Sequence, residues 1–281
     1  RYRSSAASDV YKRQTHSFGS ETNTDWEILT VSNSGVIDWN KSVWTQSIQP
    51  YEKAFGQDLD GDGSQGLNLG QLLSVDTDTY SDVLKKDSNG NFFILTEAGE
   101  HIAVTESWGG AARFDYSDQW EGGSWSSKAV AVEDIKYTNS DGNSINGYVI
   151  AIKNSGSYGS DQFTDWELRY TDGKGVIDWN NSIWMQSIKS KESLFGTNAA
   201  QADLDGDGAF GLSADALTAV SSDTAGDLLK KDDGNALYII DNKDTADTSD
   251  DVTIAITDQW GGTPTFDWSD SVSYTHLTLP T

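Results

Sequence analysis

Residues Asp58–Gly63 read DLDGDG, and the same six residues recur at Asp203–Gly208. Each copy places a carboxylate at loop positions 1, 3 and 5 and a glycine at position 6, which is the arrangement of a loop that folds around Ca²⁺. In such a loop the backbone carbonyl of position 7 is a further ligand. The pattern therefore predicts one calcium site per copy, with the ligands Asp58, Asp60, Asp62 and Ser64 in the first and Asp203, Asp205, Asp207 and Ala209 in the second.

The rest of the ligand shell is not evident from the loops themselves. A helix–loop–helix calcium site has a bidentate Glu at position 12, but this chain has Leu69 and Ala214 there. The remaining oxygens must come from elsewhere, and the candidates in the first copy are Glu52, Asp76 and Asp78. The alternative is an Asp- and Gly-rich surface turn that binds no metal. Two equivalent occurrences favour the calcium interpretation.

Both ends of the chain resemble translated sequencing adaptor. Ser4–Gln14 reads SSAASDVYKRQ and Ser271–Thr281 reads SVSYTHLTLPT. One adaptor DNA sequence encodes the first segment on one strand and Val272–Thr281 on the other. Such segments are excluded from fold prediction. We therefore expect residues 1–14 and 271–281 to be artefact and the rest to be an internal piece of a longer protein; the alternative is a pair of genuine terminal segments.

The composition is strongly acidic, with 44 Asp and Glu against 19 Lys and Arg and a net charge of -25. Such a chain has no basic patch for nucleic acid. The absence of Cys excludes disulfides, thiolate zinc sites and a Cys nucleophile, and no apolar run is long enough for a transmembrane helix. Yet 11 Trp residues indicate a folded protein. We expect a secreted or cell-surface bacterial protein.

A long internal repeat organises the chain. Thr24–Phe55 reads TDWEILTVSNSGVIDWNKSVWTQSIQPYEKAF, and Thr164–Phe195 reads TDWELRYTDGKGVIDWNNSIWMQSIKSKESLF. The second copy also inserts Thr197–Ala202 before its acidic loop. We predict two tandem modules, residues 15–138 and 139–270, the first lacking its start and the second its end.

Within each module the apolar pattern predicts a mainly β fold of antiparallel sheets, with one short helix and one DxDxDG loop. Apolar residues from Val43 to Phe55 recur at helical spacing, with Pro50 in the first helical turn and Gly56 at the helix end. Asn139–Ser144 is expected to be a linker or a hairpin loop. Strands are expected at Trp26–Val31, Val36–Trp39, Asp82–Lys86, Asn91–Thr96, His101–Thr105, Ala112–Tyr116, Lys128–Tyr137 and Gly147–Lys153.

Three segments of the second copy together resemble one known family. They are GYVIAIKN from Gly147, TDWELRYTDGKGVIDW from Thr164 and DLDGDGAFG from Asp203. They resemble the tryptophan-rich C-terminal domain first described in Synechocystis-type cyanobacteria, as does Phe55–Gly63 (FGQDLDGDG) in the first copy. The resemblance covers nearly all of the chain between the predicted adaptors. It implies tandem modules of large secreted or surface proteins, often beside calcium-binding repeats, and it implies no particular chemistry.

The tryptophans suggest a second hypothesis, a module that binds extracellular glycan or matrix. Trp26, Trp39 and Trp44 lie in strand and helix patterns and are expected in the core. Trp120 and Trp125 lie among glycines and are the candidates for ligand contact.

A polysaccharide hydrolase is the third hypothesis, since such an enzyme needs two carboxylates across a cleft. Glu27 and Glu167 recur beside Trp, as do Asp38 and Asp178, but so many acids allow any pair to be nominated. We expect these four to be solvated strand positions or outer partners of calcium. Our main prediction is therefore a non-enzymatic, calcium-binding structural or adhesive module.

Overall fold

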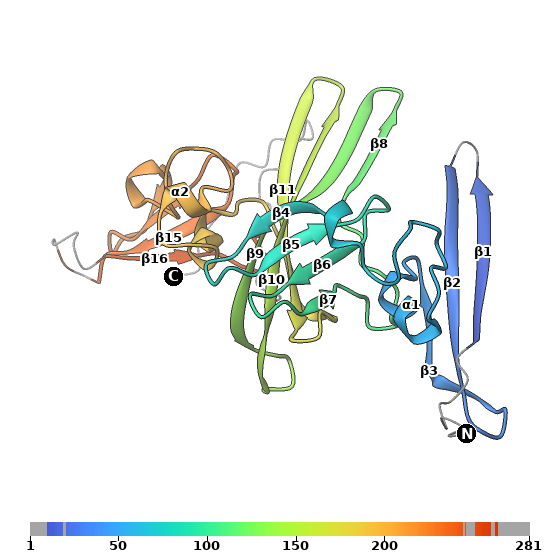
Figure 1. Cartoon of the computed structure of the whole chain (residues 1–281). Coiled ribbons are helices and arrows are strands. Elements are labelled where there is room, and N and C mark those ends of the chain that lie inside the picture. Colours follow the sequence, from blue (N-terminus) through green and yellow to red (C-terminus); the bar gives the residue numbers. More distant parts are fainter. Residues whose placement is uncertain (1–9, 19–20, 244, 246–250, 260–261, 264–281) are drawn as a thin grey trace.

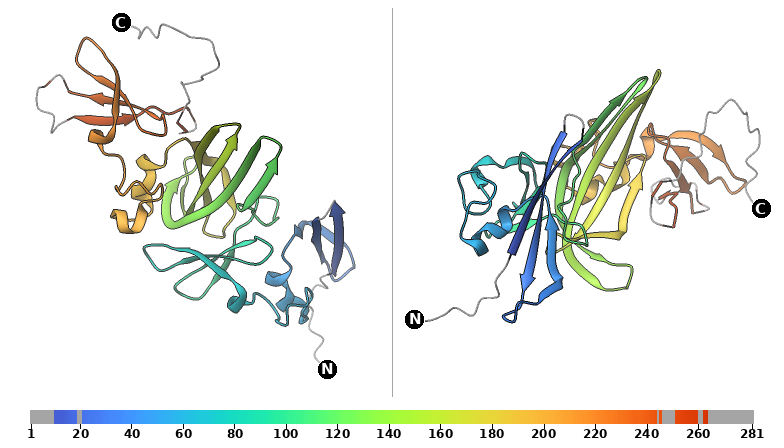
Figure 2. Two further views of the ribbon diagram at one scale, coloured as in Figure 1. Left: turned by 90° about the horizontal axis from the view of Figure 1, so that it is seen from above. Right: turned by 90° about the vertical axis from the view of Figure 1, so that its right-hand side faces the viewer.

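A computed structural model describes residues 10–18, 21–243, 245, 251–259 and 262–263 of the chain. In this part the fold is mainly β, with four antiparallel sheets and only short helices, as predicted. The sheets follow one another along an elongated molecule, with the N-terminal sheet at one end and the C-terminal sheet at the other (Figure 1 and Figure 2). Residues 1–9 and 271–281 of the predicted adaptor segments lie outside the described residues.

The first sheet has three strands: β1 (Val10–Phe18), β2 (Glu21–Val31) and β3 (Ile37–Thr45). The segment 10–14, which the sequence attributes to adaptor, forms the start of β1 and pairs with β2. Trp26 of β2 is buried as predicted, and packs with Ile28 and Ile48. This small core faces the helix that follows β3.

Two predictions about β3 are wrong. Trp39 and Trp44 are exposed rather than in the core, Trp39 to 67%, because β3 is an edge strand and only one face of this sheet is covered. Val43 and Trp44 also belong to β3 and not to the helix, since they pair with Ile28 and Glu27 of β2. The helical spacing at the start of the predicted helix was therefore coincidental, and the helix itself is only α1 (Gln49–Phe55).

The ends of α1 are as the sequence predicts. Pro50 lies in the first turn, and Gly56 ends the helix with a φ of 64°. That left-handed conformation favours glycine over any residue with a Cβ. The chain then turns directly into the first acidic loop.

The second sheet has four strands in the order of the chain: β4 (Leu73–Thr77), β5 (Val83–Lys86), β6 (Phe92–Leu95) and β7 (His101–Ala103), with the 3₁₀ helix η1 (Leu69–Gln71) before it. The predicted hairpin of β5 and β6 is confirmed. The strand predicted at 112–116 is wrong except at Tyr116, because Ala111 makes only an isolated bridge to Thr105. The chain turns back at Gly109 and Gly110, and the N–H of Ala112 donates to the carbonyl of Val104 (3.0 Å), but the pairing does not continue into a strand.

The third sheet is the largest, with the order β12-β11-β10-β9-β8. Its strands are β8 (Tyr116–Trp120), β9 (Gly123–Thr138), β10 (Ser144–Tyr158), β11 (Asp161–Asp172) and β12 (Ile177–Met185). The predicted pairing of β9 with β10 is confirmed, and residues 139–143 form their hairpin loop. The ends of the β8–β9 and β10–β11 hairpins project beyond the body of the molecule (Figure 1).

The largest core joins the second sheet to the third. Residues from both sides of the predicted module boundary at 138/139 contribute to it: Leu84, Phe92, Ile94, Val104, Ala112, Phe114, Ala129, Val132, Tyr148, Ile150, Ile152 and Ile177. The boundary itself falls in the loop of the β9–β10 hairpin. This core therefore spans the boundary between the two copies of the sequence repeat.

The remaining elements are η2 (Lys189–Leu194), α2 (Ala199–Ala202), η3 (Ala214–Ala216) and a fourth sheet of β13 (Thr218–Ser222), β14 (Leu228–Lys231), β15 (Leu237–Asp241) and β16 (Val252–Ala255). The second copy of the predicted helix is thus a 3₁₀ helix rather than an α-helix. The inserted segment of this copy forms α2. Both β2–β3 and β11–β12 have a register shift at the same place in the repeat, after Ile28 and Leu168.

Three carboxylates lie where the second sheet packs on β9. Asp76 accepts a hydrogen bond from the backbone N–H of Val132 (2.9 Å), and Glu133 accepts one from Thr79 (3.2 Å). Burial raises the pKa of Asp76, Asp78 and Glu133, and repulsion from neighbouring carboxylates adds to this for Asp78 and Glu133. At neutral pH these charges therefore oppose the packing of β4 on β9.

This cluster predicts that mild acid stabilises the metal-free protein. A raised pKa in the folded state means that the folded protein binds the proton more readily than the unfolded chain, so protonation stabilises the fold. In chelator, the thermal midpoint should rise as the pH falls from neutral toward the ordinary pKa of these carboxyl groups, about 4. Glu133→Gln removes one charge but keeps an acceptor oxygen, and should raise the midpoint at neutral pH by about 2–4 °C.

The matched control is Glu121→Gln, which removes the same charge from an exposed turn. It should leave both the midpoint and its pH dependence as in the wild type. A Glu133→Gln midpoint at or below the wild-type value at neutral pH would contradict the prediction.

Candidate calcium loops

The first acidic loop is held in a tight turn by its own aspartates. Asp58 accepts hydrogen bonds from Gly61 N (2.7 Å) and Gly63 N (2.9 Å) on its two carboxylate oxygens. Asp60 and Asp62 each accept one from the backbone N–H two residues ahead, at 3.0 and 2.8 Å. Gly61 and Gly63 have φ values of 82° and 90°, a conformation that residues with a Cβ rarely adopt. The predicted ligands therefore belong to one compact loop.

Glu52 of α1 connects the helix to this loop. Its side chain is fully buried (0% exposed) and accepts hydrogen bonds from the backbone N–H groups of Leu59 (2.6 Å), Asp60 (3.1 Å) and Gly66 (2.8 Å). Ligand oxygens of Glu52, Asp58 and Asp60 all lie within 4.8 Å of one another. Glu52, which the sequence nominated as a ligand, thus lies at the loop and positions its backbone from both ends.

The other two nominated ligands lie elsewhere. Asp76 and Asp78 accept hydrogen bonds from the backbone of β9, Asp78 from Asp134 N at 3.3 Å. They belong to the contact between β4 and β9, because the chain turns away through η1 before it reaches them. Their nomination as calcium ligands was wrong.

The second loop repeats the first bond for bond. Asp203 accepts from Gly206 N (2.8 Å) and Gly208 N (2.9 Å), and Glu192 is the counterpart of Glu52. The remaining hydrogen bonds are Asp207 N to Asp205 (3.1 Å), Ala209 N to Asp207 (2.7 Å), and Leu204 N (2.9 Å), Asp205 N (3.4 Å) and Gly211 N (2.8 Å) to Glu192. Glu192, Asp203 and Asp205 form the second acidic group of this kind in the described residues.

Glu192 was missed by the sequence analysis. It occupies the same place in the repeat as Glu52, since both are the fourth residue of the aligned segments QPYEKAF and KSKESLF. The insertion before the second loop does not disturb it, because α2 loops out between Glu192 and Asp203. Repeat position was therefore a usable criterion for finding this residue.

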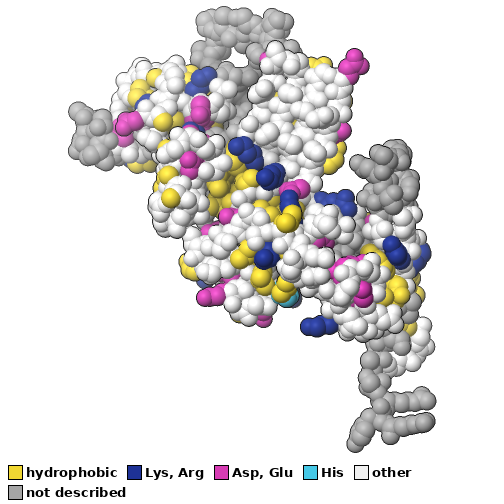
Figure 3. All heavy atoms as spheres, turned by 45° about the horizontal axis from the view of Figure 1, so that its top comes forward, with side chains coloured by type: hydrophobic (Ala, Val, Ile, Leu, Met, Phe, Trp, Pro, Cys, Tyr) yellow, Lys and Arg dark blue, Asp and Glu magenta, His cyan; other side chains and the backbone are white. Residues whose placement is uncertain are grey.

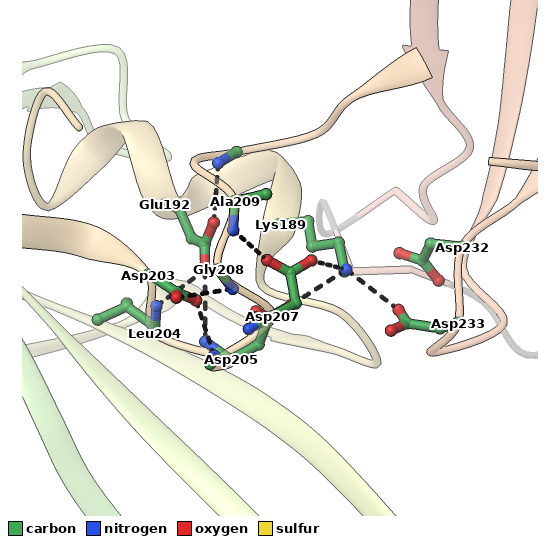
Figure 4. A network of polar contacts seen from close by, with 12 residues as sticks. Lys189, Glu192, Asp203, Leu204, Asp205, Asp207, Gly208, Ala209, Asp232 and Asp233 are labelled. Atoms are coloured by element: carbon green, nitrogen blue, oxygen red, sulfur yellow. Dashed lines mark hydrogen bonds and ion pairs between the residues drawn. The ribbon is translucent and has the colours of Figure 1, made fainter. Parts of the chain in front are cut away.

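The two loops differ in the side chain that contacts their third aspartate. In the first, Gln49 Nε2 donates to Asp62 at 3.1 Å, and the buried Gln49 Oε1 has no hydrogen-bond partner. In the second the equivalent residue is Lys189, whose Nζ contacts Asp207 and lies 3.5 Å from Asp205 and 3.3 Å from Asp233 (Figure 4). An ammonium group thus lies among the carboxylates of the second loop only.

These contacts shift the acidities of the loop carboxylates. Burial raises the pKa of Asp60 and of Asp205, although hydrogen bonds and, for Asp205, the charge of Lys189 partly offset it. The hydrogen bond from Lys189 lowers the pKa of Asp207. For Lys189 itself, burial lowers the pKa but the surrounding carboxylates outweigh burial and raise it. Both loops therefore gather negative charge that a cation would stabilise.

The carboxylates considered for a hydrolase have structural partners. Glu167 forms an ion pair with Arg169 and accepts a hydrogen bond from Asn154 at 2.9 Å. Asp178 accepts one from Tyr137 at 3.2 Å. Of the two tryptophans nominated for ligand contact, Trp120 is exposed and Trp125 is half-buried.

No model of a known protein family matches the chain, and no characterised protein or solved structure is significantly similar to it. Among the described residues, no helix has both the length and the apolar character needed to cross a membrane. The proposals below therefore depend on the residues and geometry of this chain alone.

Proposed function

We propose that the chain is a structural or adhesive module whose two halves are each fastened by one calcium ion. The observation that supports this most directly is the repeated arrangement of a buried Glu and an acidic loop. In both copies the helix or 3₁₀ helix presents a carboxylate to the loop backbone, so the loop aspartates are held together before any ion arrives. Such preorganisation lowers the free-energy cost of binding.

The chemistry of the site suits a hard cation. Three aspartates offer oxygen ligands, and the carbonyl of Ser64 or Ala209 adds a fourth, as calcium prefers. At the first loop the unpaired amide oxygen of Gln49 is a further candidate. The ion would connect the end of the helix to the loop that leads into the next sheet, and so hold neighbouring sheets in a fixed arrangement.

The expected gain in stability is large relative to the stability of a typical domain. Extracellular calcium modules bind with a Kd of about 10⁻⁴–10⁻³ M. At free calcium about 100-fold above Kd, one site adds roughly 2.7 kcal/mol, against about 5–15 kcal/mol for a whole domain. Export to a calcium-rich medium and tandem arrangement in a larger surface protein are parts of the same proposal.

The test is calorimetric titration with calcium together with thermal unfolding. We expect two ions per chain, and a midpoint that rises with calcium and falls with chelator. Asp60→Ala combined with Asp205→Ala should abolish both responses. The control removes two exposed acids, Asp141→Ala with Asp215→Ala, and should leave both responses intact. If the loop variant still binds two ions, calcium binds elsewhere and the assignment is refuted.

A further inference from the structure

The projecting end of the third sheet has two chemically different faces. On one face, three rows of four residues follow from the strand register: Trp120, Gly123, Tyr158 and Asp161; Asp118, Trp125, Gly156 and Phe163; and Tyr116, Ser127, Asn154 and Asp165. Five of these twelve residues are aromatic, and none is basic or aliphatic. We call this set the aromatic face.

At this end of the four strands, the opposite face has no aromatic residue. Its two rows are Gln119, Ser124, Ser157 and Gln162, and Ser117, Ser126, Ser155 and Thr164. In Figure 3 this projecting end is largely white, with Asp and Glu side chains at its margin and Lys and Arg side chains only at its base. The sequence thus places its large rings selectively on one side of a single-layered sheet.

Glycines let the rings lie flat against the backbone. A Cβ added to Gly123 would lie 2.7 Å from each of three indole atoms of Trp120, so the ring covers the glycine face-on. A Cβ on Gly156 would lie 2.3 Å from Phe163, and the rings of Phe163 and Trp125 are 5.7 Å apart above it. Trp120 therefore rests on the sheet at Gly123 and Phe163 contacts it at Gly156, while Trp120 remains 46% exposed and Tyr158 69% exposed.

We propose that the aromatic face binds a neutral polysaccharide. Aromatic rings that are open to solvent can stack on the apolar faces of sugar rings, while Asp118 and Asp161 offer acceptors for sugar hydroxyls. Ser127 can only accept there, because its hydroxyl donates to Asn154 Oδ1 at 2.5 Å. Three rows across four strands span roughly 14 Å in each direction, enough for a short stretch of polysaccharide. This proposal does not depend on the calcium loops.

The charges on the face disfavour other occupants. Sites that stack single-stranded nucleic acid combine aromatic rings with a positively charged groove, and the twelve residues include no Lys or Arg. An anionic glycan or lipid would be repelled by Asp118 and Asp161, the two exposed aspartates of the face. Asp is depleted at the centre of protein–protein interfaces because burial of its charge requires a cation. A neutral ligand with many hydroxyl groups can stack on the rings and donate hydrogen bonds to the carboxylates.

The test uses the full chain in calcium, with three neutral probes and one anionic probe. Microcrystalline cellulose and chitin are used in pull-down assays, and mixed-linkage β-glucan and alginate in affinity electrophoresis. We expect retention by at least one neutral probe and none by alginate. Trp120→Ala with Trp125→Ala should weaken that binding at least about tenfold, and Tyr158→Ala, at an exposed tip that does not support folding, at least about twofold.

Trp39→Ala is the control, because it removes an even more exposed tryptophan (67%) from another sheet, and it should bind as the wild type does. Absence of binding to all three neutral probes, or binding unchanged in both face variants, would overturn the proposal. So would equal retention by alginate. A dimer in sedimentation velocity that Trp120→Ala with Trp125→Ala abolishes would assign the face to contact between copies of the chain instead.

Discussion

Replacing Glu52 with Ala is expected to lower the free energy of unfolding by about 3–5 kcal/mol. The carboxylate is fully buried and accepts hydrogen bonds from three backbone N–H groups of the loop. Each buried donor that loses its partner costs about 1–3 kcal/mol. Glu52→Gln should lower the free energy of unfolding by less, since the amide oxygen can still accept from the N–H groups of Leu59 and Asp60. Some loss is expected because its NH₂ group would face the N–H of Gly66.

The measurement is chemical denaturation in chelator and in calcium. Glu52→Ala should lose stability in both, and it should also lose calcium binding at the first loop, because the aspartates are no longer held together. Glu121→Ala removes an exposed carboxylate and is the matched control. A loss of less than about 1 kcal/mol for Glu52→Ala would mean that water replaces the carboxylate and that the buried Glu does not organise the loop.

Local patterns predicted the loops and turns well. The DLDGDG segments form two closely similar turns, and Gly56 ends α1, because a glycine at positive φ is a strictly local requirement. The hairpin of β5 and β6 followed from Asn89–Gly90 in the same way. Such features depend on a few neighbouring residues and can be predicted without the rest of the fold.

Features that depend on distant partners were harder to predict. Trp39 and Trp44 look like core residues by type, but β3 is an edge strand and leaves them exposed. Asp76 and Asp78 are near the first loop in sequence, yet they contact β9. The aromatic face was only partly foreseen, through Trp120 and Trp125, because Tyr158 of β10 and Phe163 of β11 are brought beside them by strand register.

The second large effect is expected from the residue that differs between the loops. Lys189 presents its ammonium group to Asp205 and Asp207, the same carboxylates that would bind calcium. Two unit charges 4 Å apart interact by about 1 kcal/mol in water and about 4 kcal/mol near a protein surface. Calcium must displace this internal cation at the second loop, whereas at the first loop Gln49 adds a neutral amide. The first site should therefore bind calcium more tightly than the second.

Exchange of Gln49 and Lys189 should reverse which of the two loops binds calcium more tightly. With Asp60→Ala to silence the first loop, Lys189→Gln should tighten calcium binding at the second by at least about tenfold, equivalent to about 1.4 kcal/mol. With Asp205→Ala to silence the second loop, Gln49→Lys should weaken the first site by a similar factor. Both Kd values are measured by calorimetric titration at fixed ionic strength, since salt screens such charges.

Lys191→Gln separates local competition from net charge. It removes the same charge from the same 3₁₀ helix, and none of the ion pairs identified among the described residues involves it. If competition at the loop determines affinity, Lys191→Gln should change the Kd of the second site less than about twofold, because a charge beyond ion-pair distance of the loop carboxylates is more strongly screened. An equal effect of the two lysine variants would show that overall charge, and not the ammonium group beside Asp205 and Asp207, sets the affinity.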